Sequence, residues 1–423
     1  MKRLLYLLAT IACILLMTGC EAVSSISQKN PDAILNMTAE QRTEDFTYLI
    51  DTMNQLYPFW GEVKDLGVNK EELADKYNRL IADTKDDVEF LNTILDYFDE
   101  LHAYSLGHLT PIPPAAYNDF VKTYKGINDR KTWYKVLTNP TTVAMYSAMD
   151  PQSTYFKLLA NGDTNKEAAT SAASSGKSKE AMHTDIINEG KTAYIRIPTF
   201  SKLVMNDEVP KVKQFIEANK DLDDLVIDIR GNGGGSDAYW MNALVIPNIT
   251  EDKSYSKYYL YKEELLTNDR VNGYRKELYR NLKKESSSIE LLPKFDKLSL
   301  YAKNFDYYTY SANIVPAEKS TKPYNGHMWV LTDHLNGSAS ASFTDFCAEN
   351  DFATLVGEAS GGDNCNGDPS LYALPNSGLV FRFDLFYGLN PDGTCNAVSG
   401  MQPDIPCASE NALEVCLAAI NRQ

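Results

Sequence analysis

The sequence predicts an α/β protein whose core is built from parallel β-α-β units and is preceded by a small N-terminal helical domain. Two strand patterns, 192–197 and 225–229, enclose a helical pattern at 209–219. Strand, helix and strand in this order form a parallel crossover unit with a right-handed connection. The run 225–229 is dominated by β-branched residues, as is typical of a buried parallel strand. A glycine-rich loop, 231–235, follows it, and an amphipathic helical pattern begins near Ser236.

The remaining core segments lie on both sides of this unit. A first strand starts at Asp185 and is followed by a turn at Glu189 and Gly190. Another buried strand starts at His327. We therefore assign residues 185–423 to the core.

A tyrosine-rich insertion, residues 251–325, interrupts the core. Tyrosine side chains are amphipathic, so the insertion is either a peptide-binding surface or a covering of the core. A helical charge pattern at 263–284 favours the covering.

Residues 38–110 are predicted to form the small helical domain. Apolar residues recur at helical spacing after Thr38, a suitable N-cap, and again in 70–83 and 86–101. Residues 111–184 are predicted to be an insertion and flexible linker, because much of this segment is small and polar. No PDZ module is recognisable in it.

The chain begins like an exported protein. Lys2 and Arg3 precede an apolar run and then small residues, so residues 1–19 are predicted to be a signal peptide rather than a transmembrane span. The last residues of this segment, together with Cys20, resemble a bacterial lipobox. This resemblance implies a lipid on the Cys20 sulfur; simple secretion is the alternative. Residues 20–37 are then a lipidated tether. We expect a protein of the bacterial cell envelope, held at the membrane by its lipid anchor.

Charge and cysteine spacing limit the partners. The formal net charge is -16, and removal of residues 1–19, with two positive charges and no negative ones, moves it to -18. Nucleic-acid affinity comes mainly from Lys and Arg, so we expect no nucleic-acid partner. The five cysteines after Cys20 match no zinc spacing, and no metal or organic cofactor is implied. Export permits disulfides; Cys365 with Cys395 is the first hypothesis, and Cys347 is predicted to be a buried thiol.

A second stretch with candidate catalytic residues follows the strand that starts at His327. Its small residues, 337–342, lead into a helical pattern. A serine at the start of such a helix can be both exposed and close to backbone N–H donors. Alone, these serines could simply cap the helix, and the glycine loop 231–235 could simply be a turn. Together they indicate a nucleophile beside a loop that stabilises negative charge.

Five motifs occur in one order along the chain: IINEGKTAYIRIPTF, LVIDIRGNGGG, VLTDHLNGSASAS, LVGEASGG and GMQPDI. Together they resemble the C-terminal-processing, or tail-specific, serine peptidase family, most of all its tricorn-core and interphotoreceptor retinoid-binding branch. The resemblance covers about residues 185–410. It implies a ClpP/crotonase-like core and hydrolysis of peptide bonds in protein or peptide substrates.

The resemblance also implies roles for individual residues. The nucleophile falls on Ser340, and the oxyanion donors fall on the backbone N–H groups of Ala341 and Gly234. The base falls on His108, because that branch takes its histidine from a segment well before the core. Histidine suits this role since its pKa lies near working pH. His334, six residues before Ser340, is the rival.

Two family features are missing from the sequence. Asp363 stands where the lysine of tail-processing members aligns, and an aspartate does not replace an amine of lowered pKa. The segment before GMQPD carries no carboxylate, which leaves Glu358 and Asp363 as substitutes. We therefore predict a lipid-anchored serine peptidase with a Ser nucleophile and a His base. The alternative is a weakly active or inactive lipoprotein that binds a peptide or small ligand on the same scaffold.

Overall fold

The computed structural model describes most of the chain: residues 35–101, 106–127, 130–149, 181–188, 190–268, 282–317, 324–362 and 368–422. The predicted signal peptide and Cys20 lie outside these ranges. Within them, no helix has both the length and the apolar character needed to cross a bilayer.

The core is a six-stranded sheet in the order β13-β9-β8-β4-β3-β2. All neighbouring strands pair in parallel except β2, which is antiparallel to β3. The strands are β2 (His183–Asn188), β3 (Thr192–Arg196), β4 (Asp224–Asp228), β8 (His327–Thr332), β9 (Thr354–Gly357) and β13 (Ile405–Pro406). The predicted parallel crossover from β3 to β4 is confirmed.

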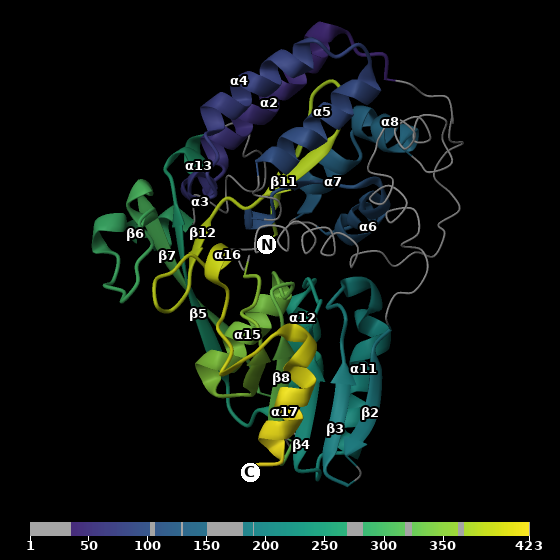
Figure 1. Cartoon of the computed structure of the whole chain (residues 1–423), viewed down its shortest axis with the longest axis vertical. Coiled ribbons are helices and arrows are strands. Elements are labelled where there is room, and N and C mark those ends of the chain that lie inside the picture. Colours follow the sequence, from purple (N-terminus) through teal and green to yellow (C-terminus); the bar gives the residue numbers. More distant parts are fainter. Residues whose placement is uncertain are drawn as a thin grey trace.

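Helices cover both faces of this sheet (Figure 1). On one face lie α11 (Lys202–Ala218), α12 (Asp237–Trp240) and α15 (Ala339–Asn350), which share a buried apolar cluster with the sheet. On the other face, α17 (Ala412–Ile420) packs against Val226 and Trp329. The predicted α/β class is therefore confirmed.

Helix α11 starts seven residues before the predicted position, at Lys202 rather than Val209. Its N-cap is Ser201, whose side chain accepts a hydrogen bond from the N–H of Leu203. Pro210 lies inside the helix. Proline is common in the first helical turn, and a start at Val209 would place Pro210 there.

The N-terminal region is helical, as predicted. Helices α2 (Ala39–Leu56), α4 (Lys70–Ala82) and α5 (Asp87–Glu100) coincide with the three predicted patterns, and α3 (Trp60–Asp65) is an addition. Thr38 caps α2 through a reciprocal pair of hydrogen bonds with Gln41. Beyond them follow η1 (Leu106–His108), β1 (Thr110–Pro111), α6 (Pro114–Tyr124), α7 (Lys131–Leu137) and α8 (Pro140–Ala148).

A segment from the C-terminal part of the chain completes this helical region. Strand β11 (Val380–Phe383) pairs with β1 on one side and with β10 (Ser370–Ala373) on the other. Figure 1 shows β11 lying among the N-terminal helices. One buried apolar cluster contains both Phe46 of α2 and Phe381 of β11. The structural division therefore differs from the predicted sequence boundary, since part of 185–423 belongs to the helical region.

The longest described elements of the tyrosine-rich insertion are strands. In a second sheet, of order β12-β5-β7-β6, β5 (Lys253–Tyr261) and β7 (Tyr307–Val315) are the long members, while β6 (Ser287–Ser288) and β12 (Tyr387–Leu389) are short. Only α13 (Glu264–Thr267) and a helical turn at 282–285 are described within the predicted helical pattern, because 269–281 lies outside the described residues. The tyrosine-rich run of β5, which precedes the predicted helical pattern, is typical of a strand.

The cysteine predictions are met only in part. Cys347 is a buried free thiol on α15, as predicted. Cys395 is also a buried free thiol in this structure. Its predicted partner, Cys365, lies outside the described residues.

Candidate active site

The glycine loop follows β4 and is held in place by polar side chains from neighbouring strand ends. Asn232 donates from Nδ2 to the carbonyl oxygen of Ile197, beyond β3. Asn336, beyond β8, donates from Nδ2 to the carbonyl oxygen of Ile229. The Asp333 carboxylate accepts a hydrogen bond from the N–H of Gly231 at 2.8 Å. The loop therefore lies at the carboxyl ends of β3, β4 and β8, where open α/β sheets bind their ligands.

Burial raises the pKa of Asp333, although its bonds with the N–H groups of Gly231 and Leu335 oppose this rise. The carboxylate links the glycine loop directly to the turn before α15. Asp333 therefore has a structural role: it joins the glycine loop to the turn that carries the predicted nucleophile.

The turn that precedes α15 carries unusual backbone geometry. Ser338 has φ 55° and ψ −125°, a conformation that residues with side chains rarely adopt. Its N–H donates to the carbonyl oxygen of Gly362 at 2.9 Å. Ser340 follows in the first turn of α15 and is fully buried. Strained non-glycine backbone is often found at functional sites, because the surrounding structure must hold it there.

The Ser340 hydroxyl has no hydrogen-bond partner among the described residues. It therefore contacts neither of the two candidate histidines within hydrogen-bond distance. Orphaned buried hydroxyl groups are uncommon in folded proteins and call for an explanation.

The glycine loop and the serine turn lie against each other at Gly234. A Cβ atom added to Gly234 would lie 2.5 Å from the carbonyl oxygen of Gly337 and 2.9 Å from the nitrogen of Ala339. Gly234 also has φ +100°, so both space and backbone conformation require glycine here. The predicted proximity of the two stretches is thus present.

The expected use of Gly234 as an oxyanion donor needs correction. Its N–H donates to the side-chain oxygen of Asn232 at 2.9 Å and is therefore already engaged. Within the described part of the chain, the N–H groups of Gly233, Gly235 and Ala341 have no acceptor. Ala341 belongs to the first turn of α15, where helical N–H groups have no partner within the helix.

The candidate base His108 lies in a left-handed turn at the end of η1. Gly107 has φ 58° and His108 has φ 55°. A Cβ atom added to Gly107 would meet the ring of Phe59 at 2.1 Å. Tyr57 donates from its hydroxyl to the carbonyl oxygen of Leu106 and so anchors the start of the turn.

This turn places His108 on a buried carboxylate that sequence reasoning missed. The Nδ1 atom of His108 lies 2.7 Å from Oδ2 of Asp384, whose side chain is 1% exposed. The N–H of Asp384 donates to the carbonyl oxygen of Gly107 at 2.7 Å. A carboxylate on Nδ1 fixes the imidazole orientation and leaves Nε2 for proton transfer, the arrangement found in serine hydrolase triads.

One signal in the sequence could have pointed to Asp384. It is the single acid in the apolar run 379–389, and acids in such runs are rarely buried without a partner. Its pairing with a histidine 276 residues away depends on the β1–β11 register, which brings Thr110 opposite Arg382.

The rival histidine also has a carboxylate partner, but in a more exposed place. The Nδ1 atom of His334 lies 2.7 Å from Oε2 of Glu358, and the two side chains are 51% and 34% exposed. Burial alone would raise the pKa of Glu358, but the bond from His334 and the N–H of Ser409 hold it below its usual value. Asp363, the other substitute acid of the sequence prediction, lies outside the described residues.

The turns of His108 and Ser340 approach the same small helix. Helix α16 (Asn396–Ser399) contacts η1. A Cβ atom on Gly362 would lie 2.0 Å from the carbonyl oxygen of Asn396, and Gly362 pairs with Gly337 in the serine turn. Figure 1 shows α16 between the helical region and the core sheet. The structure therefore brings the two segments to one junction.

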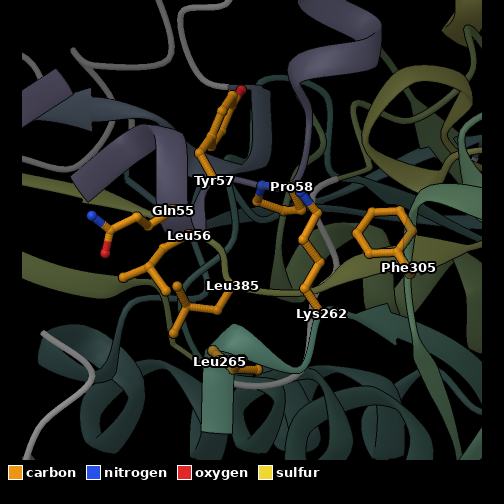
Figure 2. A pocket seen from close by; sticks show the side chains of 8 residues that line it. All are labelled: Gln55, Leu56, Tyr57, Pro58, Lys262, Leu265, Phe305 and Leu385. Carbon is orange, nitrogen blue, oxygen red and sulfur yellow. The ribbon is translucent and has the colours of Figure 1, made fainter. Parts of the chain in front are cut away.

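A small pocket nearby is separate from this junction (Figure 2). It is lined by residues from the end of α2, the start of α13 and two loops: Gln55, Leu56, Tyr57, Pro58, Lys262, Leu265, Phe305 and Leu385. Neither Ser340 nor His108 belongs to it, and it has room for about one water molecule. It is too small to receive a peptide.

Comparison with known proteins agrees with this architecture. The model of Peptidase family S41 matches residues 191–407, just over half of the chain. A search of curated protein sequences found no match. Two solved structures share the fold: a candidate peptidase from Parabacteroides merdae, with 18% identity, TM-score 0.51 and coverage of 91% of this chain and 96% of that one, and mature CPAF complexed with lactacystin, with 13% identity, TM-score 0.52 and coverage of 90% and 97%.

The family match includes β3, the glycine loop, the serine turn, β9 and α16, whereas the His108 turn lies outside it. The resemblance inferred from the five motifs is thereby confirmed. The chain belongs to peptidase family S41, a family of serine peptidases.

Proposed function

We propose that the protein is an exported, lipid-anchored peptidase in which Ser340 is the nucleophile and His108 is the base. The observation that carries this proposal is the His108–Asp384 pair at 2.7 Å, held at the same junction as the serine turn. This pair supplies the orienting carboxylate that the sequence motifs lack. The pair also favours His108 over the exposed His334 as the base.

The proposed reaction follows from these groups. His108 Nε2 accepts the Ser340 hydroxyl proton while Oγ attacks the substrate carbonyl carbon. The resulting oxyanion is stabilised by the N–H of Ala341 and by a donor from the glycine loop, for which Gly233 and Gly235 replace Gly234. The protonated imidazole then gives its proton to the leaving amine. Water hydrolyses the acyl-enzyme by the same proton transfers, which restores the serine.

The reaction requires a hydrogen bond between His108 and Ser340 that this structure lacks. Catalytic hydrogen bonds are often long in enzymes without substrate and shorten in the complex. The helical region carries His108 and the core carries Ser340, so the missing contact requires these two parts to approach each other. Substrate binding at their junction would favour this approach.

A fluorophosphonate probe tests the nucleophile. The wild type should become labelled, and Ser340→Ala should not, because the probe reacts with an activated serine hydroxyl. Ser338→Ala is the matched control on the same turn and should retain labelling. Equal labelling of wild type and Ser340→Ala would remove the main support for the peptidase proposal.

Comparison of His108→Ala with His334→Ala tests the base on a peptide-library substrate. Turnover should be lost in His108→Ala and retained in His334→Ala. The reverse result would assign the role to His334 and Glu358.

A second candidate function is ligand binding without peptide hydrolysis. The unpaired Ser340 hydroxyl and the engaged Gly234 N–H favour this candidate. It predicts that the wild type binds peptides from the library without cleaving them, and that Ser340→Ala binds them equally well.

The membrane anchor is proposed from the lipobox-like segment that ends at Cys20. Replacement of Cys20 by alanine should release the protein from the membrane fraction. Retention of this variant in membranes would reject the anchor without affecting the peptidase proposal.

A further inference from the structure

The outer edge of the tyrosine-rich sheet lacks a partner strand. In the order β12-β5-β7-β6, the two residues of β6 pair only with Tyr307 and Tyr308 of β7. Among the described residues, no strand pairs with the outer edge of β7 from Thr309 to Val315. Such an edge presents backbone N–H and C=O groups that another strand can pair with.

This edge has none of the features that usually prevent strand pairing. Natural edge strands carry charged side chains, prolines or bulges. Strand β7 has the sequence YYTYSANIV, with no charge and no proline. Its register with β5 continues without a shift from Tyr307 to Val315, so no bulge twists the edge away.

Apolar side chains accompany the unpaired edge. Tyr310 and Ile314 are 52% and 67% exposed, and Ala312 between them is also exposed. These three residues share one face because side chains alternate along a strand. Tyr258 of β5 packs against Tyr310, with ring centroids 5.0 Å apart, and extends the patch. Contiguous exposed apolar surface of this kind marks an interaction site.

We propose that this edge pairs with the same edge of a second copy of the chain. Antiparallel pairing of two β7 strands about a two-fold axis forms one continuous sheet across both protomers. With the axis at Ala312, this residue lies opposite the partner's Ala312, and Tyr310 lies opposite the partner's Ile314. Aromatic residues opposite β-branched ones are favourable cross-strand pairs, and an isologous contact closes as a dimer.

Charge restricts where a second copy can dock. The chain carries a formal net charge of -16, so most of its surface repels another copy. Strand β7 contains no charged residue, and its pairing puts no like charges opposite each other. The inner face of the same sheet is already fixed on the core, because Lys257 of β5 forms a buried ion pair with Asp345 of α15.

Sedimentation velocity of the purified full chain tests the dimer. The wild type should sediment as a dimer, and Ala312→Lys should sediment at half that mass, because it puts two lysines opposite each other on the axis. Ser254→Lys is the matched control: Ser254 is exposed on β5, opposite Ile314, and one strand away from the edge. It should remain dimeric.

Cysteine cross-linking tests the register. Residues directly opposite in an antiparallel pair have Cα atoms about 4.5–5.5 Å apart, within the range of a disulfide. Ala312→Cys should therefore give a covalent dimer on oxidation, whereas Ser254→Cys should not.

Three results would overturn the proposal. The first is a wild type that stays monomeric at its highest soluble concentration. The second is a dimer that Ala312→Lys leaves unchanged, which would place the interface elsewhere. The third is a monomer that binds anionic lipid vesicles and loses this binding in Ile314→Ser, which would make the patch a membrane surface.

Discussion

At the residue scale, the contact between His108 and Asp384 depends on a carboxylate that is almost completely buried. Asp384→Asn should keep the shape of the site but present an amide to Nδ1, which favours the wrong imidazole tautomer. We expect a loss in kcat of roughly 10⁴-fold, as for the equivalent substitution in serine proteases. Steady-state kinetics on the peptide-library substrate measures it.

Glu358→Gln is the control for this substitution, since Glu358 binds the rival His334 in the same way. It should leave kcat nearly unchanged. Equal losses in both variants would contradict the assignment of Asp384 as the orienting acid.

Gly107 allows a second prediction at this scale. Gly107→Ala should lower kcat/KM, because the new methyl group meets Phe59 and displaces the His108 turn. Gly126→Ala is a matched control: Gly126 also has positive φ, at +78°, but nothing lies within 4 Å of its added Cβ. Both variants bear the cost of left-handed backbone, about 1–2 kcal/mol. Only Gly107→Ala should lose activity when kinetics and thermal unfolding are compared.

At the scale of elements, local patterns predicted the half of the candidate site that lies in the core. Strand β4 and its glycine loop are contiguous in sequence, and so are β8 and helix α15, so periodicity and turn residues identify each pair directly. The other half could not be found in this way. Asp384 reaches His108 through the pairing of β1 with β11, and a register between distant strands is set by tertiary packing rather than by local pattern.

The tyrosine-rich insertion shows the same limit. The predicted helical charge pattern, 263–284, is described only at α13 and at 282–285, which are helical. In β5, just before it, Tyr255, Lys257 and Tyr259 point from one strand face into the buried interface. The packing of that face against α15 favoured the strand. Lys257 is the one charged residue of β5 that becomes fully buried, and its partner Asp345 was not apparent from sequence.

The Lys257–Asp345 ion pair gives a prediction at this scale. Lys257→Met leaves the Asp345 carboxylate buried without its cation, which should cost about 3–5 kcal/mol of unfolding free energy. The double variant Lys257→Met with Asp345→Leu should be markedly less destabilised, because no unpaired charge remains. Urea denaturation measures all three proteins.

Lys253→Met is the control on the same strand. Lys253 pairs with Glu251 near the surface, so its loss should change stability by less than about 1 kcal/mol. A double variant as unstable as Lys257→Met would show that the packing of the two side chains, rather than their charge, holds β5 on α15.

At the scale of the whole molecule, acid stability should depend on Asp228 at the end of β4. Burial alone would raise its pKa, but Arg230, Arg196 and the Tyr194 hydroxyl hold it below the usual value. A carboxyl with a lowered folded-state pKa adds stability above its unfolded pKa of about 3.9. This stability is lost as pH falls through the lower folded-state value.

Asp228→Asn should therefore be less stable than the wild type at neutral pH, and the difference should shrink as pH falls below about 4. Thermal unfolding followed across pH measures this convergence. Asp185→Asn, on the exposed part of β2, is the control and should follow the wild-type curve. A constant difference between wild type and Asp228→Asn at all pH values would contradict the role of its charge.

The pairing of β1 with β11 has a consequence for how the chain matures. Under the proposed export, His108 leaves the ribosome and crosses the membrane long before Asp384, because 276 residues separate them. Until the last tenth of the chain has emerged, the imidazole has no carboxylate and the helical region has no strand to complete its core. The proposed peptidase would therefore lack its orienting carboxylate until its own export is nearly complete.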